Sequence, residues 1–272
     1  MNGNRRIPVL LYHDFRAPNE ASKDNFAVAR EDFAKQMRYL SDNGFEGVSL
    51  ERLAVVLASS KERGRAGSAS RAKVVLTFDD NDVSHYDFVL PLLRGMDFTG
   101  TFFVTVNDVG KDRQMDWAMI RGLAESGMAV GSHGLVHTFL PAFDDQTLAD
   151  DMAASKRILE DNTGKRVDSL SVPQGFYDRR VLNAARSAGF RTVCASDAGY
   201  NDFSTPAPFL LKRFTMRRSY DLGSFRSIVE GRPSMSIVVA ERLRTRLRAV
   251  LGYRVYDRMR RLRYGTKQPE RE

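Results

Sequence analysis

The sequence has few of the residues on which several classes of protein depend. Its 272 residues include one cysteine, Cys194, which excludes an internal disulfide and a zinc site built from thiolates. No apolar run approaches the roughly 20 residues that a membrane-spanning helix needs, and the first such run, IPVLLY, is too short for a signal peptide. No glycine-rich phosphate loop follows the first expected strand, which counts against a dinucleotide-binding fold. We therefore expect a cytoplasmic chain with Cys194 as a buried strand thiol.

Basic residues exceed acidic ones, and the excess is concentrated near one end. The formal net charge is +8, and nine arginines against one Glu and one Asp leave +7 of it between Ala240 and Arg263. The apolar residues there recur at helical spacing: Leu243, Leu247, Val250, Leu251, Val255, Met259 and Leu262. Two interpretations stay open, a helix that packs on the domain and an interfacial helix attracted to anionic lipid at the inner face of the membrane. Few aromatic residues interleave, so nucleic acid is not an expected partner.

Strand-like and helical segments alternate along the chain. Apolar runs predict strands within 7–15, 46–49, 73–80, 99–107, 128–137, 169–173, 190–196 and 208–216, with helices within 30–43, 50–60, 86–96, 116–127, 144–164 and 179–189. The segment 60–72 is small, charged and glycine-rich, which predicts a flexible surface loop. Such alternation predicts a parallel sheet with crossover helices, and the number of units favours a closed or nearly closed barrel over an open doubly wound sheet.

Three polar features follow separate strand-like runs. Asp79 and Asp80 come directly after VVLTF, His133 and His137 lie four residues apart in GSHGLVH, and residues 171–175 read SVPQG. Within a helical turn, the histidine spacing would put both imidazoles on one side. Two His and one carboxylate form a three-ligand metal set with a position left for water. Either aspartate could then be the ligand and the other a base, and backbone N–H groups of 171–175 could face an oxyanion.

These segments resemble the NodB homology domain, the catalytic domain of polysaccharide deacetylases in carbohydrate esterase family 4. The resemblance rests on LTFDDN, GSHGLVH and SVPQG and covers roughly residues 7–215. It implies a distorted (β/α)7-type barrel over 1–235, followed here by a basic helical tail at 236–272. It also implies that Asp79 is the general base and that Asp80, His133 and His137 hold one divalent metal ion. Zn²⁺ is the expected ion, and Co²⁺, Ni²⁺, Mn²⁺ and Fe²⁺ also suit such a site.

The sequence departs from the family pattern in three places. Asn81 stands where the family usually has Gly after the Asp pair, and Asn tolerates left-handed backbone angles. The third motif, commonly R-P-P-Y-G, has Ser171 in place of the Arg that orients the base. Gln174 replaces its Tyr, and the backbone N–H there still suits the oxyanion. The late Leu-x-His motif, whose His is the usual general acid, is absent, since no His follows His137.

One branch of the family instead begins with a strand ending in Tyr-His, and LLYHDF resembles that start. By this resemblance His13 is the candidate general acid, and Tyr12, Pro173 and Gly175 are candidate substrate contacts. His85 is expected on the outer part of the site or on a helix surface. The implied function is metal-dependent removal of an N-acetyl group from a sugar in a polysaccharide, an oligosaccharide or a lipid-linked glycan precursor. A catalytically silent member that binds glycan or a biosynthetic partner is the alternative.

Overall fold

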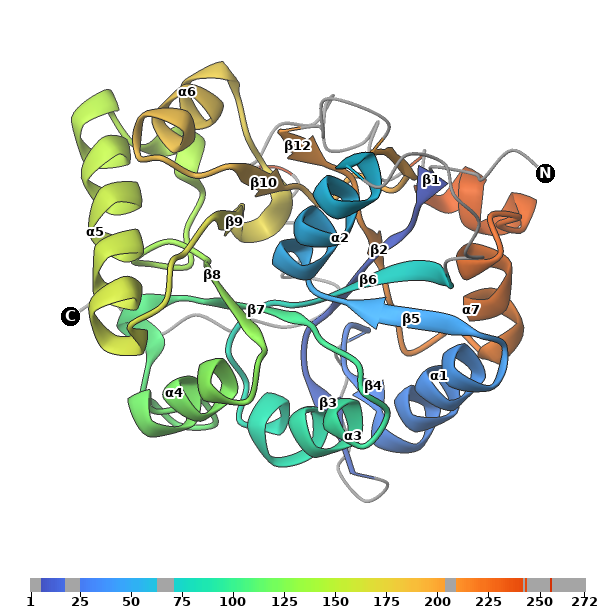
Figure 1. The fold of residues 1–272 in the computed structure, drawn as a ribbon. Coiled ribbons are helices and arrows are strands. Elements are labelled where there is room, and N and C mark those ends of the chain that lie inside the picture. Colours follow the sequence, from blue (N-terminus) through green and yellow to red (C-terminus); the bar gives the residue numbers. More distant parts are fainter. Residues whose placement is uncertain are drawn as a thin grey trace.

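The computed structural model describes residues 6–17, 25–62, 71–203 and 209–241, together with Leu243 and Val255. Within these residues a parallel sheet curls into a half-barrel that is surrounded by helices (Figure 1). This confirms the expected α/β barrel class. Most of the basic stretch between Ala240 and Arg263 lies outside the described residues, so the predicted tail helix stays a prediction there.

The sheet runs in the order β12-β10-β9-β8-β7-β6-β2-β13, and β5 also pairs with β6. Its strands are β2 (Val9–Tyr12), β5 (Phe45–Val48), β6 (Ala72–Phe78), β7 (Thr101–Val104), β8 (Ala129–Ser132), β9 (Ser169–Ser171), β10 (Thr192–Cys194), β12 (Leu210–Leu211) and β13 (Phe214–Thr215). All of these pairs are parallel. Two short pairs flank the sheet, β1 (Arg6–Ile7) with β11 (Asn201–Asp202) and β3 (Phe15–Arg16) with β4 (Val28–Ala29).

One expected strand is divided in two. The run PFLLKRFTM predicts a single strand, but β12 and β13 lie at opposite edges of the sheet. We call residues 210–215 the seam, because this short stretch of chain joins the two edges. The run breaks at Lys212 and Arg213, where the backbone leaves β10 and reaches β2. The seam therefore brings the two edges of the sheet together across the barrel.

Helices follow most strands and cover the outside of the sheet. They are α1 (Arg30–Asp42), α2 (Leu50–Glu62), η1 (His85–Val89), α3 (Leu90–Arg94), η2 (Val106–Asp108), α4 (Trp117–Glu125), η3 (Leu140–Ala142), α5 (Asp145–Thr163), η4 (Pro173–Gly175), α6 (Arg179–Ser187) and α7 (Leu222–Val229). Asp116, Asp144, Asp178 and Asp221 cap α4, α5, α6 and α7 by accepting a backbone N–H in the first turn. Such caps satisfy donors that the helix itself leaves unpaired.

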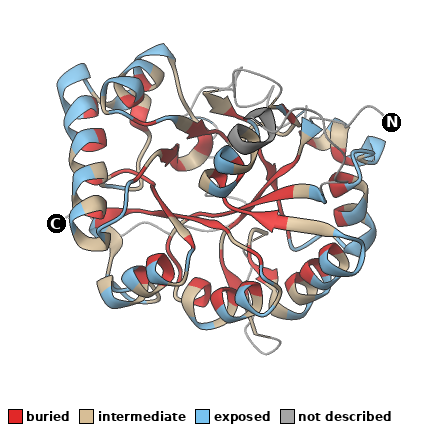
Figure 2. Ribbon diagram, in the orientation of Figure 1, coloured by how far each residue is buried: buried red, intermediate tan, exposed pale blue. Residues whose placement is uncertain are grey.

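Alternation along the strands divides the buried side chains into two clusters. The larger cluster contains Leu76 and Phe78 of β6 and packs under the surrounding helices. The smaller contains Val75 of β6, Phe103 of β7 and Leu53 of α2. Successive strand residues point to opposite faces, so the smaller cluster fills the barrel interior, where α2 closes one end. Figure 2 shows the strands buried and the outer sides of the helices exposed.

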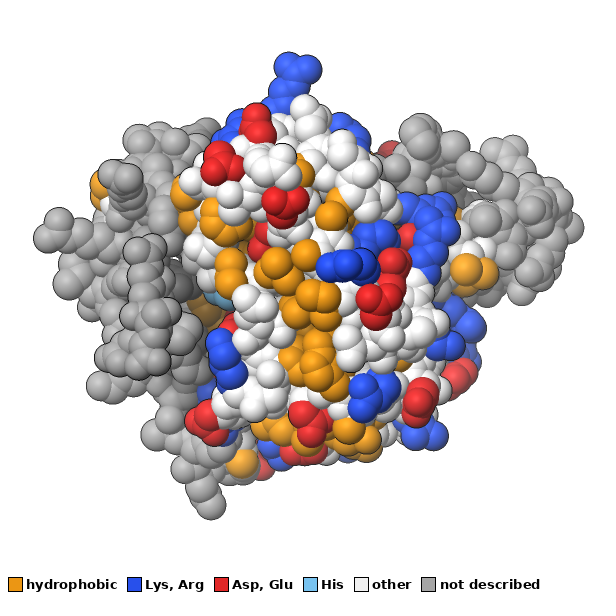
Figure 3. All heavy atoms as spheres, turned by 90° about the vertical axis from the view of Figure 1, so that its left-hand side faces the viewer, with side chains coloured by type: hydrophobic (Ala, Val, Ile, Leu, Met, Phe, Trp, Pro, Cys, Tyr) orange, Lys and Arg blue, Asp and Glu red, His pale blue; other side chains and the backbone are white. Residues whose placement is uncertain are grey.

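The outer surface over α4, α5 and α6 carries charges of both signs. Figure 3 looks at this side of the molecule and shows acidic and basic side chains scattered among hydrophobic ones. No helix within the described residues is long and apolar enough to cross a membrane. On the face drawn in Figure 3, basic side chains lie among acidic ones.

Candidate active site

The polar residues singled out in the sequence meet at the carboxyl end of the sheet. Asp79 directly follows β6, His133 follows β8, and Ser171 ends β9. The backbone N–H of Asp79 donates to the carbonyl of Tyr12, at the end of β2, over 2.9 Å. Neighbouring parallel strands end at the same rim, which is where barrel enzymes place their sites. The structure thus gathers on one rim residues that lie far apart in the chain.

Asp80, His133 and His137 turn one ligand atom each toward a common point. These three atoms lie within 4.8 Å of one another. Asp80 Oδ1 is 3.2 Å from His133 Nε2 and 3.4 Å from His137 Nε2. Oδ1 is buried, and it has no hydrogen-bond partner among the described residues. A buried carboxylate oxygen without a donor is costly unless a cation binds it, so this set fits a divalent metal with two nitrogen ligands and one oxygen ligand.

Electrostatics within the site favour ionised carboxylates. Burial raises the pKa of Asp80, but His137 and His133 outweigh it and hold that pKa well below its usual value. Burial also raises the pKa of Asp79, and the charges of Arg213 and then His133 bring it below its usual value. Burial lowers the pKa of His133, yet Asp79 and Asp80 raise it overall. Because metal ligation needs a neutral imidazole, a metal ion at this site competes with protons for His133.

A loop, and not a helical turn, carries His133 and His137. Residues 133–138 are irregular, and Gly134 adopts φ of 81°. A side chain at this glycine would begin 3.1 Å from Asp151 Oδ1 of α5. The other oxygen of Asp151 accepts the backbone N–H of Leu135 over 3.1 Å. A glycine turn that is bonded to α5 therefore brings the two imidazoles together, in place of the expected helical turn.

The orientation of His133 is fixed by its second nitrogen. Nδ1–H donates to the backbone carbonyl of Ser171 over 2.8 Å. This hydrogen bond selects the tautomer in which the lone pair of Nε2 points at Asp80. The neighbouring strand β9 thereby orients a ligand that follows β8.

The Asp79 carboxylate is held on both oxygens. Arg213 donates from Nη1 to Oδ1 over 2.8 Å and from Nη2 to Oδ2 over 2.9 Å. Ser171 Oγ donates to Oδ2 over 2.8 Å. The same Oδ2 lies 4.0 Å from His133 Nε2. Asp79 is thus a buried carboxylate that lies beside the ligand set and accepts hydrogen bonds from a guanidinium and a hydroxyl.

The turn after β6 separates the two aspartates. Asp80 has φ of 72° and Asn81 has φ of 37°, so both lie in the left-handed region. Asn81 Oδ1 accepts the backbone N–H of Thr105 over 3.1 Å, and its carbonyl accepts that of Met115 over 2.9 Å. Asn81 therefore adopts the positive φ expected at this position and ties the turn to the chain after β7.

His13 lies on the same rim, and His85 supports its backbone. Tyr12 pairs with Phe78, which places His13 level with Asp79. The His13 ring packs on Phe26 with 4.9 Å between centroids. Its Nδ1 is buried and has no hydrogen-bond partner among the described residues. Together with Asp79 and the metal-ligand set, His13 could face a bound substrate.

The expectation that His85 lies on the outside was wrong. Its side chain is fully buried, with its ring 5.7 Å from that of Phe78 and 5.8 Å from that of Phe102. Burial lowers the pKa of His85, so the ring is neutral. Its Nε2 contacts the backbone oxygen of His13 and donates its proton there. Its Nδ1 is buried and has no hydrogen-bond partner among the described residues, so ring packing and the bond to His13 hold this histidine in the core.

The loop after β9 turns sharply at Gln174 and Gly175. Gln174 has φ of 60° and Gly175 has φ of 74°. A side chain at Gly175 would lie 2.5 Å from Ser196 Oγ, so only glycine fits there. Pro173 and Gly175 are buried, whereas Gln174 is half-buried. This turn holds the Gln174 backbone at the rim, just after β9, which is the neighbour of β8, the strand that precedes His133.

Tyr12 does not join the group. Its side chain is fully buried, and its hydroxyl donates to Gln36 Oε1 of α1 over 2.7 Å. Its ring packs against Phe33 and Phe78. Strand alternation points Tyr12 outward to the helices and His13 inward.

Part of the chain matches a known protein family. Residues 66–193 match the family model described as polysaccharide deacetylase. This stretch of the chain is similar to a polysaccharide deacetylase domain.

The proteins that the chain resembles are distant from it in sequence. "Putative polysaccharide deacetylase YxkH" of Bacillus subtilis (strain 168) is 24% identical over 194 residues, which are 71% of this chain and 66% of that protein, just under two thirds of its length. The Streptococcus pyogenes deacetylase PplD has a TM-score of 0.71 at 20% identity, over 82% of this chain and 98% of that one. IcaB from Ammonifex degensii has a TM-score of 0.66 at 24% identity, over 84% and 97%. At these identities the structural matches show a shared fold.

Two residues of this candidate site were missed by sequence reasoning. Arg213 and Asp151 both bind site residues, and both come from segments interpreted only as a strand and a helix. The signal for Arg213 was its position in the apolar run LLKRFTM, where alternation places it inside the barrel with Leu211. Asp151 is a buried acid on the inner face of α5, a position that amphipathic spacing assigns to an apolar residue.

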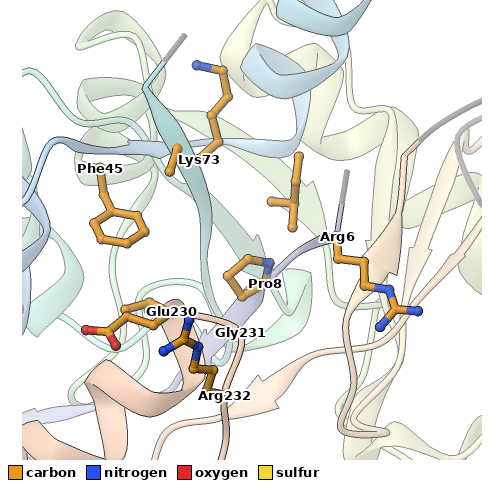
Figure 4. Close-up of a pocket in the computed structure, with 10 residues that line it drawn as sticks. Arg6, Pro8, Phe45, Lys73, Glu230, Gly231 and Arg232 are labelled. Atoms are coloured by element: carbon orange, nitrogen blue, oxygen red, sulfur yellow. The ribbon is translucent and has the colours of Figure 1, made fainter. Parts of the chain in front are cut away.

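A hollow at the opposite end of the barrel is separate from this site. It has a volume of about 430 Å³ and is lined among others by Pro8, Phe45 and Lys73, which lie near the starts of their strands (Figure 4). Lys73 is paired with Glu46 over 2.6 Å. Since the predicted site residues all lie at the carboxyl end, this hollow is not the place where they would meet a substrate.

Proposed function

We propose that the protein is a metal-dependent deacetylase that removes the acetyl group from an N-acetylated sugar. The observation that carries this proposal is the meeting of Asp80, His133 and His137 beside a separately held carboxylate, Asp79. A nearby base and an open three-ligand set are the parts that hydrolysis of an amide needs. The match of residues 66–193 to the polysaccharide deacetylase family supports a glycan as the substrate.

The chain's own residues divide the work between the two sides of the acetamide. A divalent ion held by Asp80, His133 and His137, with Zn²⁺ the expected ion, would supply Lewis acidity and acidify a water molecule. Asp79 accepts the proton of the water that adds to the acetyl carbonyl. The backbone N–H of Gln174 donates to the oxygen on which negative charge develops.

The leaving amine needs a proton, because an expelled amide anion is far too basic. We propose that His13 donates it, because His13 directly follows β2 and lies level with Asp79, which follows the neighbouring strand β6. The carbon–nitrogen bond then breaks, and acetate and the free amino sugar are the products. Pro173 and Gly175, in the turn after β9, are proposed to shape the wall against which the sugar lies.

The test combines metal content with release of acetate. The purified chain should hold one divalent ion, and His133→Ala or His137→Ala should abolish binding. Acetate release should be measured on nucleotide-linked, lipid-linked and polymeric N-acetylated sugars. A chain that binds metal and sugar but releases no acetate would support the alternative, a catalytically silent member of the family. Equal metal in the wild type and both variants would overturn the site assignment.

We also propose that the basic stretch between Ala240 and Arg263 contacts an anionic membrane surface. Its net charge of +7 supports this, because each basic residue near such a surface contributes to attraction. Contact with the inner face of the membrane would suit a lipid-linked sugar, and a cytoplasmic location remains a prediction.

A further inference from the structure

Arg213 is a fully buried guanidinium whose five N–H donors all have acceptors. Nε donates to the carbonyl of Ala195 over 2.9 Å. Nη1 donates to Asp79 Oδ1 over 2.8 Å and to Thr77 Oγ1 over 3.3 Å. Nη2 donates to Asp79 Oδ2 over 2.9 Å and to Ser171 Oγ over 2.8 Å. A buried charge is tolerated when its pairing is this complete, so the geometry of the whole group is fixed.

The proton positions in this network agree with one another. Thr77 Oγ1 donates to the carbonyl of Leu10 and therefore accepts from Arg213. Ser171 Oγ donates to Asp79 Oδ2 and therefore also accepts from Arg213. Both hydroxyls thus present a lone pair to the guanidinium, and Asp79 receives three hydrogen bonds without giving one.

The position of Arg213 in the chain explains why it can reach Asp79. It lies in the seam, between β12 and β13, where strand pairing is interrupted. Its guanidinium lies over the ring of Phe103 in the barrel interior, 5.6 Å from the ring centroid. Thr77 lies on the inward face of β6, Asp79 directly follows that strand, and Ser171 ends β9. One side chain from the seam therefore joins two separate strands at the rim.

Asp79 lies close enough to the ligand set to bind the same metal ion. Its Oδ2 is 4.0 Å from His133 Nε2, while Asp80 Oδ1 is 3.2 Å from the same nitrogen. Both carboxylates are hard anionic oxygens that suit the same divalent ions. What distinguishes them is their partners: Asp80 Oδ1 has no hydrogen bond within the described residues, whereas both oxygens of Asp79 are occupied.

We propose that Arg213 is a positioning residue that, with Ser171, reserves Asp79 for proton transfer and keeps it from becoming a fourth metal ligand. The inference rests on the proposed function for the role of Asp79 as a base. The part concerning ligation stands on the contacts of Arg213 alone. The adjacent aspartates acquire different tasks because only Asp79 is held by the seam.

The experiment uses the full chain loaded with Co²⁺, whose visible absorption depends on the number and type of its ligands. Arg213→Ala should retain one ion per chain, change the Co²⁺ spectrum and lower kcat by about 100-fold with KM nearly unchanged, since a misplaced group costs about this much. The Asp79→Asn variant alone should have the same Co²⁺ spectrum as the wild type. The double variant with Arg213→Ala and Asp79→Asn should also have the wild-type spectrum, because the competing carboxylate is gone.

Two further variants keep the test decisive if Arg213→Ala does not fold. Arg213→Lys keeps the charge but cannot bind both oxygens of Asp79, and Ser171→Ala removes one of the three hydrogen bonds. Both should lower kcat while metal content stays at one ion per chain. Lys73→Met is the matched control, since it breaks a partly buried ion pair at the opposite end of the barrel. It should leave the spectrum and kcat unchanged.

Wild-type kcat and an unchanged Co²⁺ spectrum in folded Arg213→Ala or Arg213→Lys protein would overturn the inference. Failure of the proposed function is recognised separately, as a wild-type chain that binds metal and releases no acetate from any substrate. In that case a change of spectrum in Arg213→Ala that Asp79→Asn reverses still supports the part concerning ligation.

Discussion

At the scale of single residues, two adjacent aspartates meet opposite surroundings. Asp79 receives hydrogen bonds from Arg213 and Ser171, whereas Asp80 faces His133 and His137. Asp79→Asn should keep the metal and lower turnover by about 10²- to 10⁴-fold, the range typical of general acid–base catalysis. Asp80→Asn should weaken metal binding as well, because a charged ligand is lost. Metal titration and acetate release on both variants check this, and equal metal loss would show that the roles are divided wrongly.

His13 offers a second test at this scale, because its proposed role depends on the leaving group. His13→Ala should keep metal and fold and lower turnover of an N-acetylated sugar by about 10²- to 10⁴-fold. An activated ester such as 4-nitrophenyl acetate has a leaving group that needs no proton. Its turnover should change far less in the same variant. Equal losses on both substrates, or none on the sugar, would contradict a role as general acid.

At the scale of elements, α5 holds the loop that carries both histidine ligands. Asp151 is 4% exposed, and burial, which exceeds the effect of its hydrogen bonds to the backbone of Leu135 and Val136, raises its pKa to about 6. An acid whose pKa is raised on folding stabilises the fold at low pH, and that contribution is lost as the pH rises through the folded value. Ionisation of the buried Asp151 carboxyl therefore lowers the free energy of unfolding at neutral pH, and this cost is absent near pH 4.

Asp151→Asn should remove this pH dependence while keeping an acceptor for the Leu135 N–H. Between the usual pKa of 3.8 and the folded value of about 6, each pH unit is worth about 1.4 kcal/mol. The unfolding free energy of the variant, minus that of the wild type, should rise by up to about 3 kcal/mol from pH 4 to pH 8. Urea unfolding of metal-free protein at both values checks this, with Asp150→Asn on the exposed face of α5 as the control. A difference that stays constant would contradict the prediction.

The elements also show what could be predicted from the sequence. Asp79 with Asp80 and His133 with His137 are local patterns that follow strand-like runs, so the ligand set was within reach of sequence reasoning. Arg213 was not, because its contact with Asp79 joins residues 134 positions apart and exists only once the sheet has curled. The hydrogen bond from the Leu135 N–H to the Asp151 carboxylate likewise depends on how α5 packs. Tyr12 was assigned to the substrate although alternation with His13 points it into the core.

At the scale of the whole molecule, the chain that follows α7 packs on the barrel at the point where the basic stretch begins. Residues 235–241 are helical, with Ile237 and Glu241 buried and Met235 and Val239 exposed. Glu241 accepts from Arg217 Nε over 3.3 Å and from the Tyr220 hydroxyl over 3.2 Å. The predicted boundary between barrel domain and tail, at 235/236, thus precedes residues that still contact the barrel. A test of the basic stretch should therefore change its charges and leave this packed part of the chain in place.

The last prediction concerns this basic stretch in the full chain. Replacing Arg258, Arg260 and Arg261 with Gln removes three positive charges. Each basic residue near an anionic surface contributes about 1 kcal/mol, so affinity for vesicles containing phosphatidylserine should fall by about 100-fold. The effect should shrink as salt rises, because attraction at a surface is screened. Turnover of a soluble N-acetylated sugar should not change.

The matched control removes the same charge from exposed helix positions elsewhere. Arg52, Arg94 and Arg121 lie on α2, α3 and α4 and are exposed. Their replacement by Gln should leave vesicle binding within about threefold of the wild type, since charges beyond about 10 Å from the membrane are screened at ordinary salt. Sedimentation with vesicles at low and at physiological salt measures both sets. If the control set weakens binding as much as the first, attraction reflects net charge alone and no membrane-facing segment exists. If the wild type does not bind the vesicles at low salt, the proposal that the basic stretch contacts a lipid surface is wrong.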